Sequence, residues 1–319
     1  MLLKSNFKKR IIAWTPVRRV VNQSKRSYIR GFEGFSLYDV ATTFKQQSER
    51  HSMLERAAAI SFNVFMAIPP TLLFIFTLIP YLPISESFIR ELYGLIRDVV
   101  PGRENNAVIS EFLEDFLKNP RNELLSFGLF LSLFFSSNAM MGILRSFDKN
   151  YEGFLKRSGF AKRSTALKLT LMVFTLVFLC LLLLIAQGVV LHWIGIRSSA
   201  LKLVITNARW IIIIGIIFFI VSFIYRHGPA TDRKWPFITT GSVFSTSLMI
   251  IATALVSYWV NNFSNYNKLY GSISAVFILM SLIFINALVV FMGFELNVTI
   301  ASLKRKARAG KAADLPLKN

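Results

Sequence analysis

The sequence predicts an all-α polytopic membrane protein with six transmembrane helices and both termini in the cytoplasm. Hydrophobic residues make up 54% of its 319 residues, and 30 residues are phenylalanine, which is too apolar for a soluble domain. Six apolar runs are each long enough for a helix to cross the core of a bilayer. These predicted spans are residues 57–80, 124–147, 167–191, 203–225, 237–260 and 271–300.

The net charge of +20 fits either a nucleic-acid-binding protein or a membrane protein whose basic residues gather on the cytoplasmic side. Lysine and arginine outnumber acids by 12 to 4 in residues 1–56, 7 to 2 in 145–168, 3 to 1 in 226–235 and 6 to 1 in 301–319. Six spans place these four segments on one side, whereas five or seven spans break the pattern. The distribution therefore favours cytoplasmic termini and requires no nucleic-acid partner.

The spans divide the chain into a basic N-terminal segment (1–56), a transmembrane domain (57–300) and a basic tail (301–319). The N-terminal segment contains short amphipathic stretches, so it lies at the membrane surface or forms a solvated tail. The outside loop at 81–123 has apolar residues at helical spacing, which predicts two amphipathic helices. The apolar faces of these helices can pack on the spans, on a partner protein or on the outer leaflet.

Four motifs occur in order along the chain: "RAAAISFNVFMAIPPTLLFI", "FFSSNAMMGILRSFDKNYE", "YRHGPATDRKWPFITTGS" and "LYGSISAVFILMSLIFINALVVFMGFELN". Together they resemble the YihY/BrkB family of bacterial inner-membrane proteins, over roughly residues 30–300. The chain departs from the family pattern at Pro69-Pro70, where one proline is expected, and at Asn63, where the family often has tyrosine.

The resemblance implies a six-helix protein of the bacterial inner membrane concerned with envelope integrity, and export of a lipid or glycan has been proposed for the family. The family also carries an old ribonuclease label, but metal-dependent cleavage needs clustered histidines and carboxylates. The three histidines of this chain lie in separate segments, and its one cysteine, Cys180, lies in an apolar run. Because nucleotide-binding and serine-nucleophile motifs are also absent, the sequence predicts no enzyme, metal or cofactor.

Polar side chains at membrane depth are the remaining candidates for a binding site. With the predicted topology, Asn63, Ser136, Ser137, Asn138 and Asn286 share one layer of the inner leaflet. A polar cavity between the first, second and sixth spans is one interpretation, and hydrogen bonds that hold the bundle together are the other.

Three further features have alternative explanations. Pro69 and Pro70 are predicted to kink the first span, either to line a cavity or as a structural kink satisfied by neighbouring groups. Arg209 either extends outward beside Trp210 or faces the bundle and holds an anionic headgroup. The small residues Gly241 and Ser245, four apart, predict a close contact between helices.

Glu295 lies about 36 Å along the last predicted helix from Gly271, which places it near the cytoplasmic edge of the membrane. Arg145 ends the second span at the same level, and we expect the two to form an ion pair. Asp148 and Arg226 are rival partners.

The favoured hypothesis is a protein that moves or hands over a lipid or glycolipid, with membrane lipids and possible envelope proteins as its partners. An alternative is a non-transporting scaffold that docks partners through residues 81–123, and a third, unfavoured hypothesis is a nuclease. The proposed substrate-binding residues are Asn63, Ser137, Asn138, Arg145, Arg209, Asn286 and Glu295.

Overall fold

The computed structural model describes residues 15–50, 52–82, 89, 93, 103–148, 154–193, 199–231, 234–262 and 273–313. Over these residues the chain is helical and contains no strand, which confirms the all-α prediction. Its helices are α2 (Thr15–Arg26), η1 (Arg30–Phe32), α3 (Leu37–Arg50), α4 (Met53–Leu78), η2 (Ile79–Tyr81), α6 (Arg103–Lys118), α7 (Asn122–Phe147), α8 (Gly159–Trp193), α9 (Ser199–His227), α10 (Thr240–Asn262) and α12 (Ile273–Ala313).

The predicted spans coincide with α4, α7, α8, α9, α10 and α12. Within the described residues, four stretches are long and apolar enough to cross a membrane: Met53–Tyr81, Asn122–Phe147, Thr240–Trp259 and Val276–Ala309. Large apolar side chains are exposed on these helices, among them Phe130 of α7, which is 68% exposed. Because lipid is the natural solvent for such a surface, the chain is a polytopic membrane protein.

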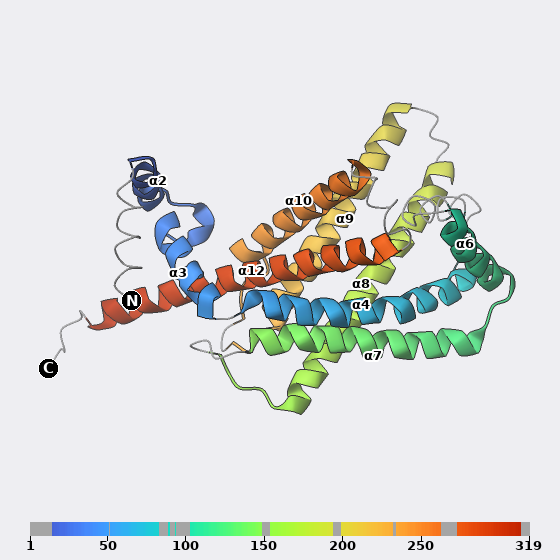
Figure 1. Cartoon of the computed structure of the whole chain (residues 1–319), viewed down its shortest axis with the longest axis horizontal. Helices are drawn as coiled ribbons and strands as arrows, with labels where there is room; N and C mark the ends of the chain where they lie inside the picture. The colour runs from blue at the N-terminus through green and yellow to red at the C-terminus, as the bar shows by residue number, and fades with distance from the viewer. Residues whose placement is uncertain are drawn as a thin grey trace.

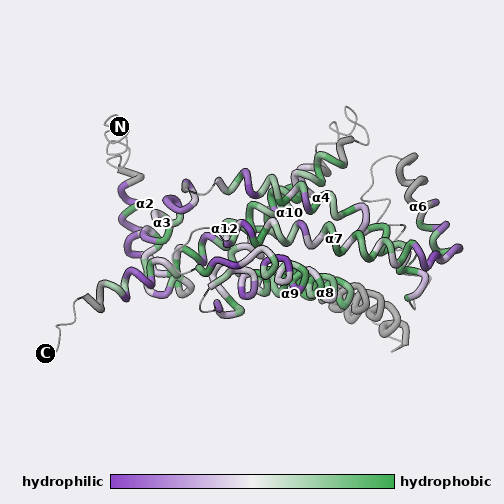
Figure 2. The backbone as a smooth tube through the Cα atoms, turned by 90° about the horizontal axis from the view of Figure 1, so that it is seen from below, coloured by the Kyte–Doolittle hydropathy of each residue, from purple (hydrophilic) through white to green (hydrophobic). Residues whose placement is uncertain are grey.

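The helices pack as neighbours along much of their length. α4 lies antiparallel to α7, α12 contacts both α4 and α10, and α8 contacts α7 and α9 (Figure 1). Figure 2 shows α8 and α9 together along one edge of the molecule. Glycines of α7 bring α4 close, since a Cβ built on Gly128 would lie only 3.2 Å from the backbone of Phe74.

Four buried aromatic rings join α7, α9 and α12 at the end of the bundle where α4, α8 and α10 begin. We call this the basic end, because the basic side chains Arg145, Lys156, Arg157 and Arg226 lie there. Phe147 stacks on Phe294 with 3.8 Å between ring centroids, and Tyr225 and Phe291 pack around the pair. Aromatic contacts of this kind fix the spacing of the helices that carry them.

The N-terminal segment packs against α12 rather than forming a separate tail. Phe32 and Val40 are buried with Leu296 and Ile300 of α12. The helix α12 continues to Ala313, about 60 Å from its first residue, so most of the predicted basic tail belongs to the same helix as the last span.

The outside loop contributes α6, which lies against the far end of α4. Leu113 of α6 is fully buried beside Ile79 of η2, and Phe116 is 3% exposed. Among the described side chains of α6, Leu113 and Phe116 are therefore buried within the chain itself. Of the other helix predicted for this loop, the structure describes Ile89 and Tyr93, both helical, and Tyr93 packs against Ile79 and Leu113. The rest of that predicted helix lies outside the described residues.

Candidate functional site

Two glycines form the crossing of α10 and α12 at the basic end. A Cβ built on Gly241 would lie 2.1 Å from the carbonyl oxygen of Gly293, and one on Gly293 would lie 1.8 Å from Ser245 Oγ. Only a residue without a side chain fits at such distances. The close contact predicted at Gly241 and Ser245 is confirmed, and it brings the first turn of α10 against α12.

Hydrogen bonds fix the two helices at this crossing. Asn297 Oδ1 accepts a bond from the Gly241 N–H (2.8 Å), and its Nδ2 donates to Thr239 Oγ1 (3.0 Å). The Tyr225 hydroxyl lies 2.7 Å from Ser245 Oγ and 2.6 Å from the Val290 carbonyl oxygen. Because both the oxygen and the nitrogen of the Asn297 amide form hydrogen bonds, this side chain holds α12 to the start of α10, and we call it the clamp.

A cavity of about 650 Å³ lies beside this crossing. Its walls come from η1 and the turn after it, from the connection between α9 and α10, and from the last turns of α12. Its lining residues are Gly31, Glu33, Thr231, Lys234, Trp235, Pro236, Ile238, Thr239, Thr240, Asn297, Ile300, Ala301, Lys304, Arg305 and Arg308.

Three of the four basic residues of this cavity come from α12, and two of them, Lys304 and Arg308, lie on one stripe of the helix. Asn297, Ala301, Lys304 and Arg308 follow one another at helical spacing and share a face. Lys304 lies about 46 Å along the helix from Ile273, close to the full thickness of a bilayer with its headgroups. Lys304 and Arg308 therefore follow the apolar part of α12 along the same helix.

The N-terminal segment closes one side of the cavity. The Thr240 hydroxyl donates to the Gly31 carbonyl oxygen (2.5 Å), and Glu33 forms an ion pair with Lys304. Further along α12, the Thr299 hydroxyl donates to Gln47 Oε1 (2.8 Å). These contacts hold residues far apart in sequence around one space.

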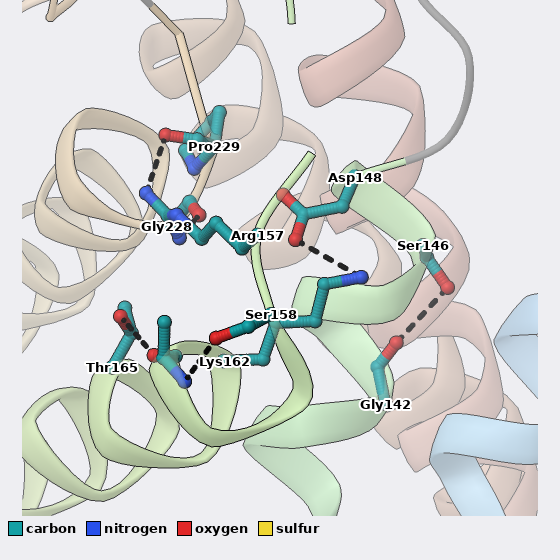
Figure 3. Close-up of polar contacts among 10 residues, drawn as sticks. Gly142, Ser146, Asp148, Arg157, Ser158, Lys162, Thr165, Gly228 and Pro229 are labelled. Atoms are coloured by element: carbon teal, nitrogen blue, oxygen red, sulfur yellow. Dashed lines mark hydrogen bonds and ion pairs between the residues drawn. The ribbon is translucent and has the colours of Figure 1, made fainter. Parts of the chain in front are cut away.

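A second group of polar contacts ties α7, α8 and α9 together (Figure 3). Asp148 has a side chain only 1% exposed and lies 3.4 Å from Lys162 Nζ. Arg157 donates to the carbonyl oxygens of Gly228 (2.8 Å) and Pro229 (3.1 Å) at the end of α9. These contacts hold the connection between α7 and α8 in place. None of Asp148, Arg157 and Lys162 lines the cavity.

The predicted layer of polar side chains does not converge on one space. Asn63 donates to the Ala59 carbonyl oxygen and Asn286 to that of Leu282, each at 2.9 Å within its own helix. Ser137 is fully buried. Ser136 is partly buried, and none of these groups lines the cavity described above.

Asn138 contacts α8 instead of α4 or α12. Its Oδ1 accepts a hydrogen bond from Arg163 Nη1 (2.6 Å), and the guanidinium group lies 5.6 Å from the centre of the Phe134 ring. This contact fits the second interpretation of the polar layer, in which amides hold helices together.

Replacing Asn138 by leucine is expected to destabilise the protein by about 1.5–3 kcal/mol, because the guanidinium of Arg163 loses its charged hydrogen bond. The measurement is thermal unfolding of the detergent-solubilised protein. Asn286→Leu is the matched control, with little loss expected, since the amide of Asn286 bonds only its own helix and its buried Oδ1 has no hydrogen-bond partner. A loss for Asn286→Leu as large as that for Asn138→Leu would contradict this assignment.

The predicted ion pair between Arg145 and Glu295 is wrong. Glu295 is fully buried within α12, whereas Arg145 is exposed at the end of α7. No ion pair joins Arg145 and Glu295 among the described residues. Asp148, named as a rival partner for Arg145, pairs with Lys162 instead.

The structure gives the backbone position of two other predicted features, the prolines of the first span and Arg209. Pro69 and Pro70 lie inside α4, which continues to Leu78 without interruption, so the first span is not a broken helix. Arg209 lies within α9, but its side chain is outside the described part of the structure.

A family model described as virulence factor BrkB matches residues 44–316 of the chain. The chain belongs to the BrkB family. The match covers the helices from α3 to α12 and confirms the resemblance drawn from the four sequence motifs. The matched region includes the α12 wall of the cavity but not Glu33.

This BrkB-family chain is also similar to the ribonuclease-like protein YfkH of Bacillus subtilis (strain 168). The two are 29% identical over 259 residues, which cover 80% of the chain and 92% of YfkH. No solved structure matches the chain.

Among the described residues there is no group of three or more histidine, cysteine or acidic side chains close enough to hold a metal ion. Sequence reasoning missed the cavity because it counted Lys234, Lys304 and Arg308 only as indicators of topology. The available signal was the helical spacing that places Lys304 and Arg308 on the same face as Asn297 of the "GFELN" motif.

Proposed function

We propose that this BrkB-family protein is a six-span protein of the bacterial inner membrane that supports the integrity of the cell envelope. In this proposal it binds a lipid or glycolipid at its basic end, which faces the cytoplasm, and hands it over. The alternation of basic segments supports this orientation, and the helical structure of α8 and α9 supports the count of six spans.

The observation that carries the proposal is the cavity beside the crossing of α10 and α12. It combines four cations with an apolar side formed by residues such as Trp235 and Ile300, and an amphipathic molecule needs both surfaces. Basic pockets between transmembrane helices on the cytoplasmic side are typical sites for anionic headgroups. The proposed site therefore replaces the one first inferred between α4, α7 and α12.

A scaffold that docks partners through residues 81–123 gains less support. Leu113 of α6 packs beside Ile79, and Phe116 is 3% exposed. These two apolar side chains are thus not open to another protein. A nuclease has no support from the described residues, and we propose that the protein is not an enzyme.

Replacing Lys304 and Arg308 together by glutamine is expected to weaken binding of an anionic lipid by about 30-fold, since each basic residue near the membrane surface contributes about 1 kcal/mol. Binding is measured by native mass spectrometry of the full-length protein with added lipid. The same double variant is expected to fail to complement a deletion strain.

The matched control replaces Lys45 and Lys306 by glutamine, which removes the same charge outside the cavity. Both residues are exposed, and Lys306 lies about 200° around α12 from Lys304. We expect this control to bind lipid and to complement as the wild type does. If the cavity variant also behaves like the wild type, the proposed function is wrong.

A further inference from the structure

We propose that the ligand of this cavity carries a phosphate group, and that Glu33 of the N-terminal segment occupies Lys304 as an internal competitor until the ligand binds. The inference rests on the proposed function, because it concerns the same cavity. It adds the chemical class of the ligand and a means of controlling access.

The charge of the cavity matches a phosphate group. Lys234, Lys304, Arg305 and Arg308 line it together with Glu33, so basic side chains outnumber acidic ones by four to one among the lining residues. A phosphate monoester carries about 1.5 to 2 negative charges at neutral pH. Arginine can bind two phosphate oxygens at once, and lysine adds a point charge.

A neutral sugar would find few free partners here. The amide of Asn297 already bonds Gly241 and Thr239, and the Thr240 hydroxyl donates to Gly31. By contrast, among the described residues no carboxylate lies within ion-pair distance of Lys234 or Arg308. The side chains of the cavity that are available to bind a ligand are therefore the cations Lys234 and Arg308.

The fold fixes the position of Glu33. Glu33 and Gly34 both have positive φ angles, 51° and 88°, which turn the chain sharply after η1. Phe32 on one side is buried against α12, and Gly31 sits so close to Thr240 that a Cβ would lie 2.7 Å from its Oγ1. The carboxylate is thus presented to Lys304 by a defined turn.

The contact between Glu33 and Lys304 is suited to exchange. The two side chains are 47% and 43% exposed, and ion pairs with this exposure are weak. A dianionic phosphate attracts Lys304 more strongly than a single carboxylate does. The carboxylate oxygens of Glu33 therefore hold the place that phosphate oxygens take in the bound state.

The test measures the affinity of the full-length protein in detergent for short-chain phosphatidic acid, for phosphatidylcholine with the same chains and for inorganic phosphate. Glu33→Gln is expected to bind phosphatidic acid two- to fivefold more tightly than the wild type, because the competitor is gone. Glu49→Gln is the matched control, since it removes one exposed acidic charge from α3, away from the cavity, and no change is expected.

A second comparison shows whether the effect runs through Lys304. In a Lys304→Gln background, Glu33→Gln is expected to change the affinity less than it does in the wild type, because ligand and carboxylate no longer share that cation. If Glu33→Gln binds phosphatidic acid more tightly than the wild type but binds inorganic phosphate equally, the natural ligand is a lipid phosphate. Tighter binding of inorganic phosphate as well assigns the site to the phosphate group itself, and either result supports the inference.

The inference is overturned if Glu33→Gln and Glu49→Gln give equal affinities, or if the protein prefers phosphatidylcholine. Wild-type binding of phosphatidic acid that still depends on Lys304 and Arg308 would then leave the proposed function standing. If the wild-type protein binds no lipid at the cavity, both the inference and the proposed function are wrong.

Discussion

Replacing Gly293 by alanine is expected to lower the stability of the folded protein by at least about 3 kcal/mol. The new Cβ would lie 1.8 Å from Ser245 Oγ, 2.6 Å from the Gly241 carbonyl oxygen and 2.7 Å from the Tyr225 hydroxyl. Overpacking alone costs about 1–3 kcal/mol, and α10 cannot move away without breaking the hydrogen bonds of Tyr225 and Ser245. Denaturant or thermal unfolding in detergent measures the loss.

Gly215 in α9 provides the control, because a Cβ there meets nothing within 4 Å. Gly215→Ala is expected to leave stability unchanged or to raise it by up to about 1 kcal/mol, as alanine favours the helix. The close crossing of α10 and α12 would be refuted by similar stabilities for the two variants.

Replacing Phe147 by alanine is expected to cost about 3–5 kcal/mol, which is the usual range for removing a buried phenylalanine. The ring is fully buried and contacts Tyr225, Phe291 and Phe294, so its loss leaves a cavity where α7, α9 and α12 meet. A loss of stability should therefore appear in thermal unfolding even without a change in the lipid site itself.

Phe130 lies on the same helix but is 68% exposed, so Phe130→Ala removes an equal volume from the surface. We expect this variant to cost less than about 1 kcal/mol, because lipid replaces the missing contacts. If Phe147→Ala is no worse than Phe130→Ala, the aromatic cluster does not hold the bundle together.

The helices could be predicted from the sequence because hydropathy and helix length both follow from the bilayer. The second span was predicted as 124–147 and α7 is Asn122–Phe147. α12 was harder, because its basic residues after Ala301 ended the apolar pattern although the backbone stayed helical. Apolarity marks where lipid ends, and the hydrogen-bonded helix can continue beyond that point.

The site was not predictable from depth alone. Arg145 and Glu295 were predicted to share a level in the membrane, but depth leaves the direction of each side chain around its helix undetermined. Asn138 was assigned either to a polar cavity or to hydrogen bonds between helices, and its partner in the structure, Arg163 of α8, was not among the residues considered for either. Contacts between helices depend on rotation and crossing angle, which arise from packing.

The contribution of the N-terminal segment was also beyond the sequence. Its basic composition suggested a membrane-surface segment or a tail, and the contacts of Phe32 and Val40 with α12 come from tertiary packing. The "GFELN" motif drew attention to Glu295, whereas Asn297, two residues later, forms the clamp beside the cavity. Both differences matter because these residues shape the space around Lys304.

The most direct test of the central claim is an experimental structure of the protein in nanodiscs that contain phosphatidic acid. The account predicts phosphate density in the cavity beside Lys304, Arg308 and Lys234, with the acyl chains directed toward the membrane. An empty cavity, with lipid bound instead between α4, α7 and α12 near Asn63 and Asn286, would contradict it.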